Sequence, residues 1–188
     1  MPKNILKLSY TLAICILLTV LFTSYWAVRQ SLATKENDAK IINVAGRQRM
    51  LSQKITQLAL RLVATNDTVQ KKSISFQLQK TLALWQQSHN ALKFGNVQFN
   101  ISQPENNEPI LFQLNELEKT LNSIVQSCNS ILQNEKSKEE ALNTIIKNQD
   151  IFLPSMDAVV KAYEKKSDEK LQFTKNLQTG LLLLSLLV

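Results

Sequence analysis

The chain has 188 residues, of which only 3 are glycine and 4 are proline, and it carries 22 lysines and arginines against 15 acidic residues. Long stretches without helix breakers favour helices, and no segment alternates apolar and polar residues as a half-buried strand does, so we expect an all-α fold. The net charge of +7 is too small and too dispersed for a nucleic-acid-binding surface, so we expect no nucleic-acid partner.

The first element along the chain is predicted to be a transmembrane helix. Residues 8–28 contain no charged side chain, and about 20 apolar residues are enough to span the hydrocarbon core of a membrane. Tyr25 and Trp26 stand where interfacial aromatic residues are found. A cleaved signal peptide is the alternative, but this run is longer than the apolar region of a signal peptide. Lys3 and Lys7 precede the run and predict a cytoplasmic N-terminus.

Four helical segments are predicted after this anchor, over residues 31–64, 69–94, 110–133 and from 137 onward. Their apolar residues recur at steps of three and four, which gives each helix one buried face. These faces are Val44, Gln48, Leu51, Ile55, Leu58 and Leu62; Leu78, Leu82, Trp85, His89 and Leu92; Leu114, Leu117, Leu121, Ile124, Cys128 and Ile131; and Leu142, Ile145, Gln149, Phe152, Met156, Val159 and Tyr163. We therefore expect an antiparallel four-helix bundle, in which His89 is a hydrogen-bonded core residue rather than a ligand or an acid–base group.

The last element is predicted to be the beginning of a second transmembrane helix. Gly180 is followed by the apolar residues 181–188, which are too few to span a membrane. We interpret them as a truncated helix, with an interfacial C-terminal tail as the alternative. The expected organisation is an N-terminal tail and transmembrane helix over 1–29, a helical bundle over 30–179, and the start of the second transmembrane helix over 180–188.

The first helix of the bundle carries a second periodic stripe beside its apolar face. The stripe also repeats at steps of three and four, and it comprises Asp38, Ile42, Ala45, Arg49, Ser52, Thr56, Ala59 and Val63. Most of these side chains are small, which lets two helix axes approach closely. A helix with two such faces has two partners, so the stripe predicts a homodimer seam formed by Ile42, Ala45, Ser52, Thr56 and Ala59.

Arg49 on a two-fold seam would face its own copy, and the two guanidinium groups would repel each other. A small anion on the axis would replace this repulsion by two charge-assisted contacts, and a planar oxyanion matches the planar guanidinium fork. Gly46, one turn earlier, has no side chain and would let the backbone come close to such a ligand. The alternative is that Arg47 and Arg49 are solvated cations of the helix surface, paired with nearby acids.

The segment from Ile42 to Lys54 reads INVAGRQRMLSQK and resembles the signature of the PilJ-type domain, the N-terminal sensor region of type IV pilus methyl-accepting chemotaxis transducers. The same family includes the periplasmic regions of the nitrate/nitrite sensor kinases. Residues 152–157 and 163–164 resemble the end of that domain, so the resemblance covers about residues 30–179.

The resemblance implies a bundle that lies in the periplasm, is anchored in the bacterial inner membrane and dimerises through its first helix. In the nitrate sensors an arginine directly before a methionine binds nitrate at the dimer axis, close to a glycine. The matching residues here are Arg49 and Gly46, and Arg47 is the third candidate anion-binding residue. Ligand binding in that family shifts the first and last helices along one another and so signals to a cytoplasmic output module.

This chain departs from the nitrate sensors around the arginine. They read Gly-Ser-Leu-Arg-Met-Gln-Ser-Tyr, whereas residues 46–53 read Gly-Arg-Gln-Arg-Met-Leu-Ser-Gln. The arginine–methionine pair and the serine residue are kept, but the flanking residues differ. Nitrate, nitrite, another small oxyanion and no ligand at all therefore remain open.

Two classes of function are compatible with these features. The first is a transmembrane receptor input domain that senses a small ligand as a homodimer and relays a helix shift across the membrane. The second is a non-sensory dimerisation or scaffold module of a membrane signalling or pilus-associated complex. We expect no enzymatic activity, no cofactor and no metal, because the sequence has no nucleophile–base pair, metal-ligand cluster or phosphate loop. The adjacent Glu139 and Glu140 fit the start of a helix, where its dipole favours acidic side chains.

Overall fold

The computed structural model describes residues 3–102, 104, 106–133 and 137–186, so the outermost residues of both predicted membrane segments (1–2 and 187–188) lie outside the described part. The helices are α1 (Lys3–Ala64), α2 (Thr68–Phe94), α3 (Glu108–Gln133) and α4 (Lys138–Leu186), with a short 3₁₀ helix η1 (Val97–Phe99) between α2 and α3. Among the described residues no strand forms, and a single isolated bridge joins Asn96 and Ile101. The prediction of an all-α fold is confirmed.

The chain divides into two compact units. The first unit comprises Met1–Asp38 and Lys165–Val188, and within it Lys170 Nζ donates to Asp38 Oδ1 over 3.1 Å. Among the described helices, the one over Lys7–Ala64 is long and apolar enough by composition to cross a membrane. It contains the charge-free run predicted to be a membrane anchor.

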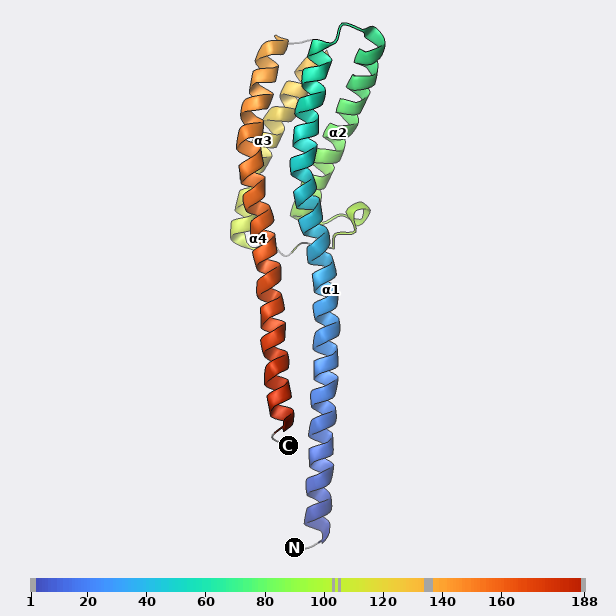
Figure 1. Ribbon diagram of the computed structural model, residues 1–188, viewed down its shortest axis with the longest axis vertical. Coiled ribbons are helices and arrows are strands. Elements are labelled where there is room, and N and C mark those ends of the chain that lie inside the picture. The colour runs from blue at the N-terminus through green and yellow to red at the C-terminus, as the bar shows by residue number, and fades with distance from the viewer. Residues whose placement is uncertain (1–2, 103, 105, 134–136, 187–188) are drawn as a thin grey trace. The chain divides into compact units, whose positions relative to one another are not determined.

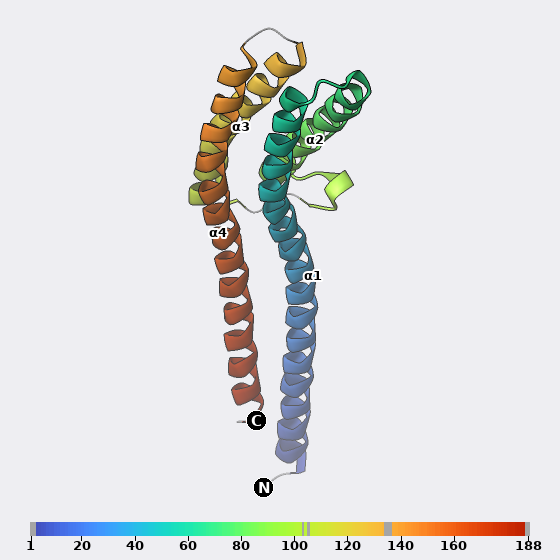
Figure 2. The same ribbon diagram turned by 45° about the horizontal axis from the view of Figure 1, so that its top comes forward.

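The second unit, Ala39–Glu164, is the helical bundle. Short connections make α2 antiparallel to the bundle part of α1 and α4 antiparallel to α3 (Figures 1 and 2). The apolar faces predicted for the four segments meet in one core, and all the predicted residues of α2 and α3 are buried. Trp85 of α2 and Phe152 of α4 are in edge-to-face contact, with ring centroids 4.9 Å apart.

Both ends of α2 are fixed by capping interactions that the sequence contains. Asp67 is the N-cap, and its Oδ1 accepts a hydrogen bond of 2.8 Å from the Val69 backbone N–H. Gly95 ends the helix with φ at 79°, a conformation that glycine adopts without strain, and its N–H donates to the Ala91 carbonyl. The expected helix end at Gly95 is confirmed.

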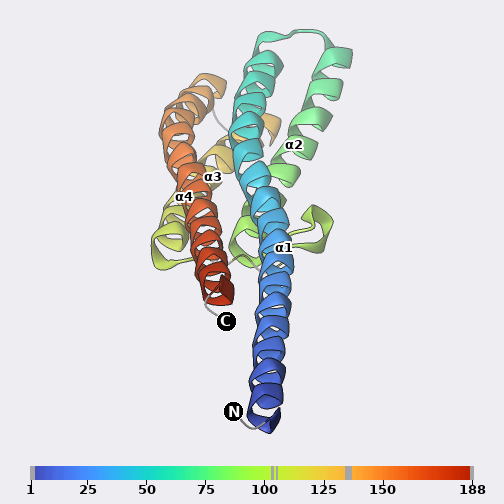
Figure 3. The same cartoon turned by 60° about the horizontal axis from the view of Figure 1, so that its bottom comes forward.

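In the connection that follows α2 along the chain, η1 lies in a small loop that projects from the bundle (Figure 3). Asn106, which follows η1 in the connection, links this loop to two helices. Its Nδ2 donates to the Leu92 carbonyl near the end of α2 over 2.8 Å, and its Oδ1 accepts from the Tyr163 hydroxyl of α4, also over 2.8 Å. The last turns of the bundle part of α4 are thereby attached to the end of α2.

Candidate functional site

Four of the five residues predicted to form the dimer seam are buried within the single chain. Ala45, Ser52 and Ala59 have no exposed surface within the single chain, and Thr56 keeps only 8%. A side chain already buried in its own bundle has no surface left for a second chain. Ile42 is half-buried and packs against the same core.

Within the bundle unit, one residue of the stripe contacts α4 of the same chain. Arg49 belongs to the stripe, and its Nη1 forms an ion pair with Asp157 Oδ1 of α4. The small side chains of the stripe are buried within the chain, and its arginine contacts another helix of the same bundle. Steps of three and four identify a contact face of a helix, but the same pattern fits a neighbour from either chain.

The ion pair between Arg49 and Asp157 lies at the surface of the bundle. The Arg49 side chain is 46% exposed and the Asp157 side chain is 45% exposed. An ion pair that is this exposed contributes up to about 1 kcal/mol to stability. The guanidinium group therefore binds a planar carboxylate in this structure while much of it remains open to water.

Gly46 lies three residues before Arg49, on nearly the same side of α1. Among the described residues, a Cβ atom added to Gly46 would meet no atom within 4 Å outside its own helical surroundings. Glycine inside a helix costs about 1 kcal/mol relative to alanine, and packing within this chain does not require it. The missing side chain leaves free space on the outer surface of the helix.

Arg47 does not join this arrangement. It is exposed, and within the described part of the chain no ion pair involving it is found. Two residues correspond to about 200° of rotation around an α-helix, so Arg47 and Arg49 leave α1 on opposite sides. The structure brings Gly46 and Arg49 together and keeps Arg47 apart.

A buried polar contact, whose role the sequence analysis missed, fixes α1 directly beside Arg49. Gln48 is fully buried, and its Nε2 donates to Ser88 Oγ of α2 and, over 3.4 Å, to the Trp85 carbonyl. A buried amide is costly unless it is hydrogen-bonded, so this contact restricts how α1 can rotate against α2. A glutamine on an otherwise apolar helix face was the available signal in the sequence.

His89 is a core residue, as predicted, with 1% of its surface exposed. Burial lowers the pKa of His89 to about 4, with a smaller lowering from Lys93 and an opposing contribution from Glu118. Lys93 and Glu118 themselves form an ion pair of 2.6 Å. The Leu114 backbone raises the pKa slightly, but within the described residues neither ring nitrogen has a hydrogen bond of good geometry, so the predicted hydrogen bond is not supported. His89 is therefore neutral near pH 7.

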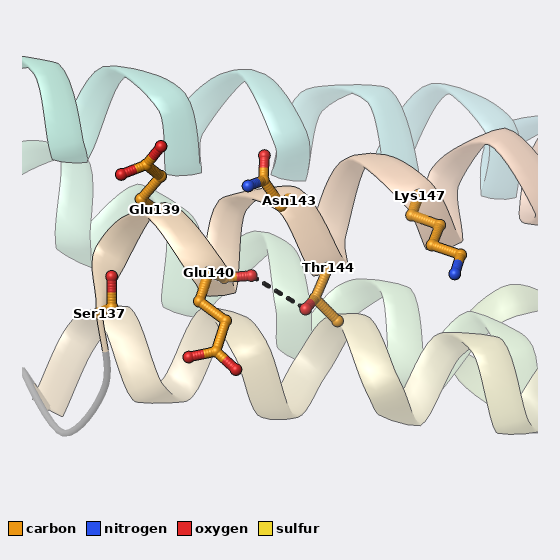
Figure 4. Close-up of a pocket in the computed structure, with 6 residues that line it drawn as sticks. All are labelled: Ser137, Glu139, Glu140, Asn143, Thr144 and Lys147. Carbon is orange, nitrogen blue, oxygen red and sulfur yellow. Dashed lines mark hydrogen bonds between the residues drawn. The ribbon is translucent and has the colours of Figure 1, made fainter.

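The acidic start of α4 does not form a second site. Figure 4 shows that the carboxylates of Glu139 and Glu140 leave the first turn of α4 in different directions. The one hydrogen bond drawn runs from the Thr144 hydroxyl to the Glu140 carbonyl, over 2.9 Å. Both acids lie in the first helical turn, which agrees with their interpretation as helix-start residues.

A different face of α1 is open within the bundle unit. Its exposed or half-buried residues also repeat at steps of three and four: Ala39, Asn43, Gly46, Met50, Gln53, Gln57, Leu60 and Ala64. Met50 is 55% exposed and Leu60 is 42% exposed. The face includes Gly46 and runs beside Arg49, so it can pair with another helix.

The chain is similar to known proteins in both sequence and structure. A family described as the type IV pili methyl-accepting chemotaxis transducer N-terminal domain (PilJ) matches residues 31–145. No curated protein matches the chain. Among solved structures, the ligand-binding domain of the P. aeruginosa nitrate receptor McpN is similar, with a TM-score of 0.55 and 24% sequence identity over 68% of this chain and 96% of that chain. This structural likeness shows the fold.

Proposed function

Since the chain belongs to the family of type IV pilus methyl-accepting chemotaxis transducer N-terminal domains, we propose that it senses a small planar oxyanion through Arg49 at a homodimer interface. Family membership supports the coarser statement that the chain is a sensory input domain of chemotaxis transduction. The ligand, the interface and the relay across the membrane are the proposal.

The ion pair between Arg49 and Asp157 carries the proposal of an oxyanion ligand. A carboxylate and a nitrate or nitrite ion present similar planar oxygen atoms to a guanidinium group. Arg49 binds such a group from within the chain and still has about half of its side chain exposed. The solved domain with the same fold belongs to a nitrate receptor, which makes nitrate the first ligand to test.

The open face of α1 supports a homodimer through this helix. The face has the 3–4 repeat of a helix-pairing surface and combines apolar Met50 and Leu60 with the side-chain-free Gly46. Two copies pairing here about a two-fold axis would bring both Arg49 side chains to the edge of the interface, on either side of one anion. This face replaces the seam first predicted from the buried stripe.

The charge-free run of α1 supports a membrane-anchored receptor. We propose that Lys3 and Lys7 keep the N-terminus in the cytoplasm, which places the bundle in the periplasm of a bacterial inner membrane. Residues 1–29 and 180–188 would hold the two membrane segments and 30–179 the sensor domain. A ligand-induced shift between α1 and α4 would then pass through these segments.

Calorimetric titration of the detergent-solubilised chain with nitrate, nitrite and chloride at constant ionic strength tests the ligand. We expect nitrate or nitrite to bind, and Arg49→Ala to abolish the binding. Arg61→Ala, an exposed arginine on the same helix, is the matched control and should bind as the parent does. Binding that survives Arg49→Ala, or that both variants lose equally, would rule out Arg49 as the anion-binding residue.

Cysteine cross-linking tests the interface in a chain that lacks Cys15, the exposed native cysteine. A cysteine at Met50 or Gln57 should give disulfide-linked dimers, whereas one at the buried Ala45 should give none. Efficient dimers from Ala45 alone would restore the seam first predicted and contradict the open face.

One observation favours the alternative of a non-sensory dimerisation or scaffold module. Arg49 has a carboxylate partner in its own chain and thus needs no external anion to balance its charge. A scaffold would give the same cross-links at Met50 and no heat of binding with any of the anions.

A further inference from the structure

We propose that Asp157 is an internal competitor of the ligand, a chain-borne oxyanion that occupies Arg49 and sets the affinity and the consequence of anion binding. The inference rests on the proposed function and adds to it a residue of α4 that neither the periodicity of α1 nor the arginine motif of residues 42–54 contains. The observation behind it is the Arg49–Asp157 ion pair.

The chemistry of the pair makes Asp157 a mimic of the ligand. The contact uses Nη1 of the guanidinium and one carboxylate oxygen, which is the contact that a free oxyanion would also make. An incoming anion either displaces the carboxylate or binds to the remaining N–H donors with a negative charge a few ångströms away. In both cases Asp157 weakens anion binding, because like charges at this distance repel.

The exposure of the pair limits the size of this effect. With both side chains about half exposed, water screens the interaction, and an exposed ion pair is worth about 0.2–1 kcal/mol. Competition of this size weakens anion binding by a factor of about 1.4 to 5. Asp157 thus lowers the affinity without preventing binding.

The position of Asp157 on α4 gives the competition a mechanical consequence. Arg49 lies on α1, so an anion that takes the place of the carboxylate removes a polar contact between the two helices. Met156 and Val159, the core residues on either side of Asp157, stay buried and keep α4 in the bundle. Anion binding therefore loosens the α1–α4 contact at one level without unfolding the domain.

Three variants of the full chain in detergent test the role of Asp157 by nitrate titration at constant ionic strength, which keeps charge screening equal. We expect Asp157→Asn to tighten nitrate binding by a factor of about 1.4 to 5, and Asp157→Glu, which keeps the charge, to bind closer to the parent. Asp150→Asn is the matched control, because it removes an exposed acid of the same helix and should leave the affinity unchanged.

The outcomes separate this inference from the proposed function. Nitrate binding that appears only in Asp157→Asn supports the competition as strongly as a tightened affinity does. If the parent binds nitrate and Asp157→Asn binds it equally or more weakly, Asp157 does not compete, and the inference fails while the sensor function stands. If neither the parent nor Asp157→Asn binds nitrate, both fail. If Asp150→Asn tightens nitrate binding as much as Asp157→Asn does, the effect comes from net charge alone, and the inference is also overturned.

Discussion

Replacing His89 by leucine should remove a defined part of the acid sensitivity of the bundle. The pKa of His89 is about 4 in the folded chain against 6.5 for an unperturbed histidine, because burial disfavours the charged ring. Between these values the unfolded chain binds a proton that the folded chain does not, so stability is complete above pH 6.5 and falls as the pH decreases towards 4. A difference of this size corresponds to a loss of about 3 kcal/mol by pH 4.

The measurement is chemical unfolding of the detergent-solubilised chain at several pH values between 7 and 4. The sequence contains one histidine, so the difference in pH dependence between the parent and His89→Leu isolates this residue. The pKa of Glu118 is lowered, chiefly by its hydrogen bond from Lys93, and this carboxylate is present in both the parent and the variant. Ile124→Val is a control that should lower stability by about 1 kcal/mol at every pH and keep the slope. An unchanged slope in His89→Leu, or a folded-state His89 ring that titrates near 6.5 by NMR, would refute the argument.

Three further predictions concern the site and its supports. Gly46→Ala should raise the free energy of unfolding by up to about 1 kcal/mol in thermal melts, because the added Cβ meets no atom within 4 Å outside its own helix. The same substitution should weaken nitrate binding, because the methyl group fills the free space on the outer surface of α1. An unchanged affinity for nitrate would exclude Gly46 from the site. Gln48→Leu should weaken nitrate binding indirectly, because it removes the hydrogen bond to Ser88 that orients α1. A nitrate affinity equal to that of the parent would contradict this. Tyr163→Phe and Asn106→Ala should each cost about 1 kcal/mol and be non-additive in a double-mutant cycle, as expected for bonded partners.

Much of the helical architecture follows from local features of the sequence. The N-cap Asp67 and the C-cap Gly95 determine where α2 begins and ends, so its predicted limits differ from the observed ones by one residue at most. The core faces of α2 and α3 are regular in steps of three and four, and every predicted residue on them is buried. Periodicity and caps are local properties, which is why a sequence alone reveals them.

The partners of each face are not local properties, so periodicity alone does not identify them. The stripe through Ala45 and Ser52 was correctly recognised as a contact face but was assigned to a second chain. Whether a small-residue face meets another helix of the same bundle or of a partner depends on how all four helices are arranged. The pairing of Asp157 with Arg49 was overlooked for the same reason, because 108 residues separate the two along the chain.

The bonds around Asn106 bear on how a signal could leave the bundle. Tyr163 lies one residue before the end of the bundle unit, and its hydroxyl donates to Asn106 Oδ1. The Nδ2 of Asn106 donates in turn to the Leu92 carbonyl near the end of α2. Sliding α4 by about 3 Å along its axis, across the direction of the 2.8 Å Tyr163–Asn106 bond, would stretch it beyond hydrogen-bonding range. Such a bond is either formed or broken, so we expect α4 to occupy discrete positions along its axis. The Tyr163–Asn106 bond would then hold α4 in place during small thermal motions and release it only when a larger force acts on the helix.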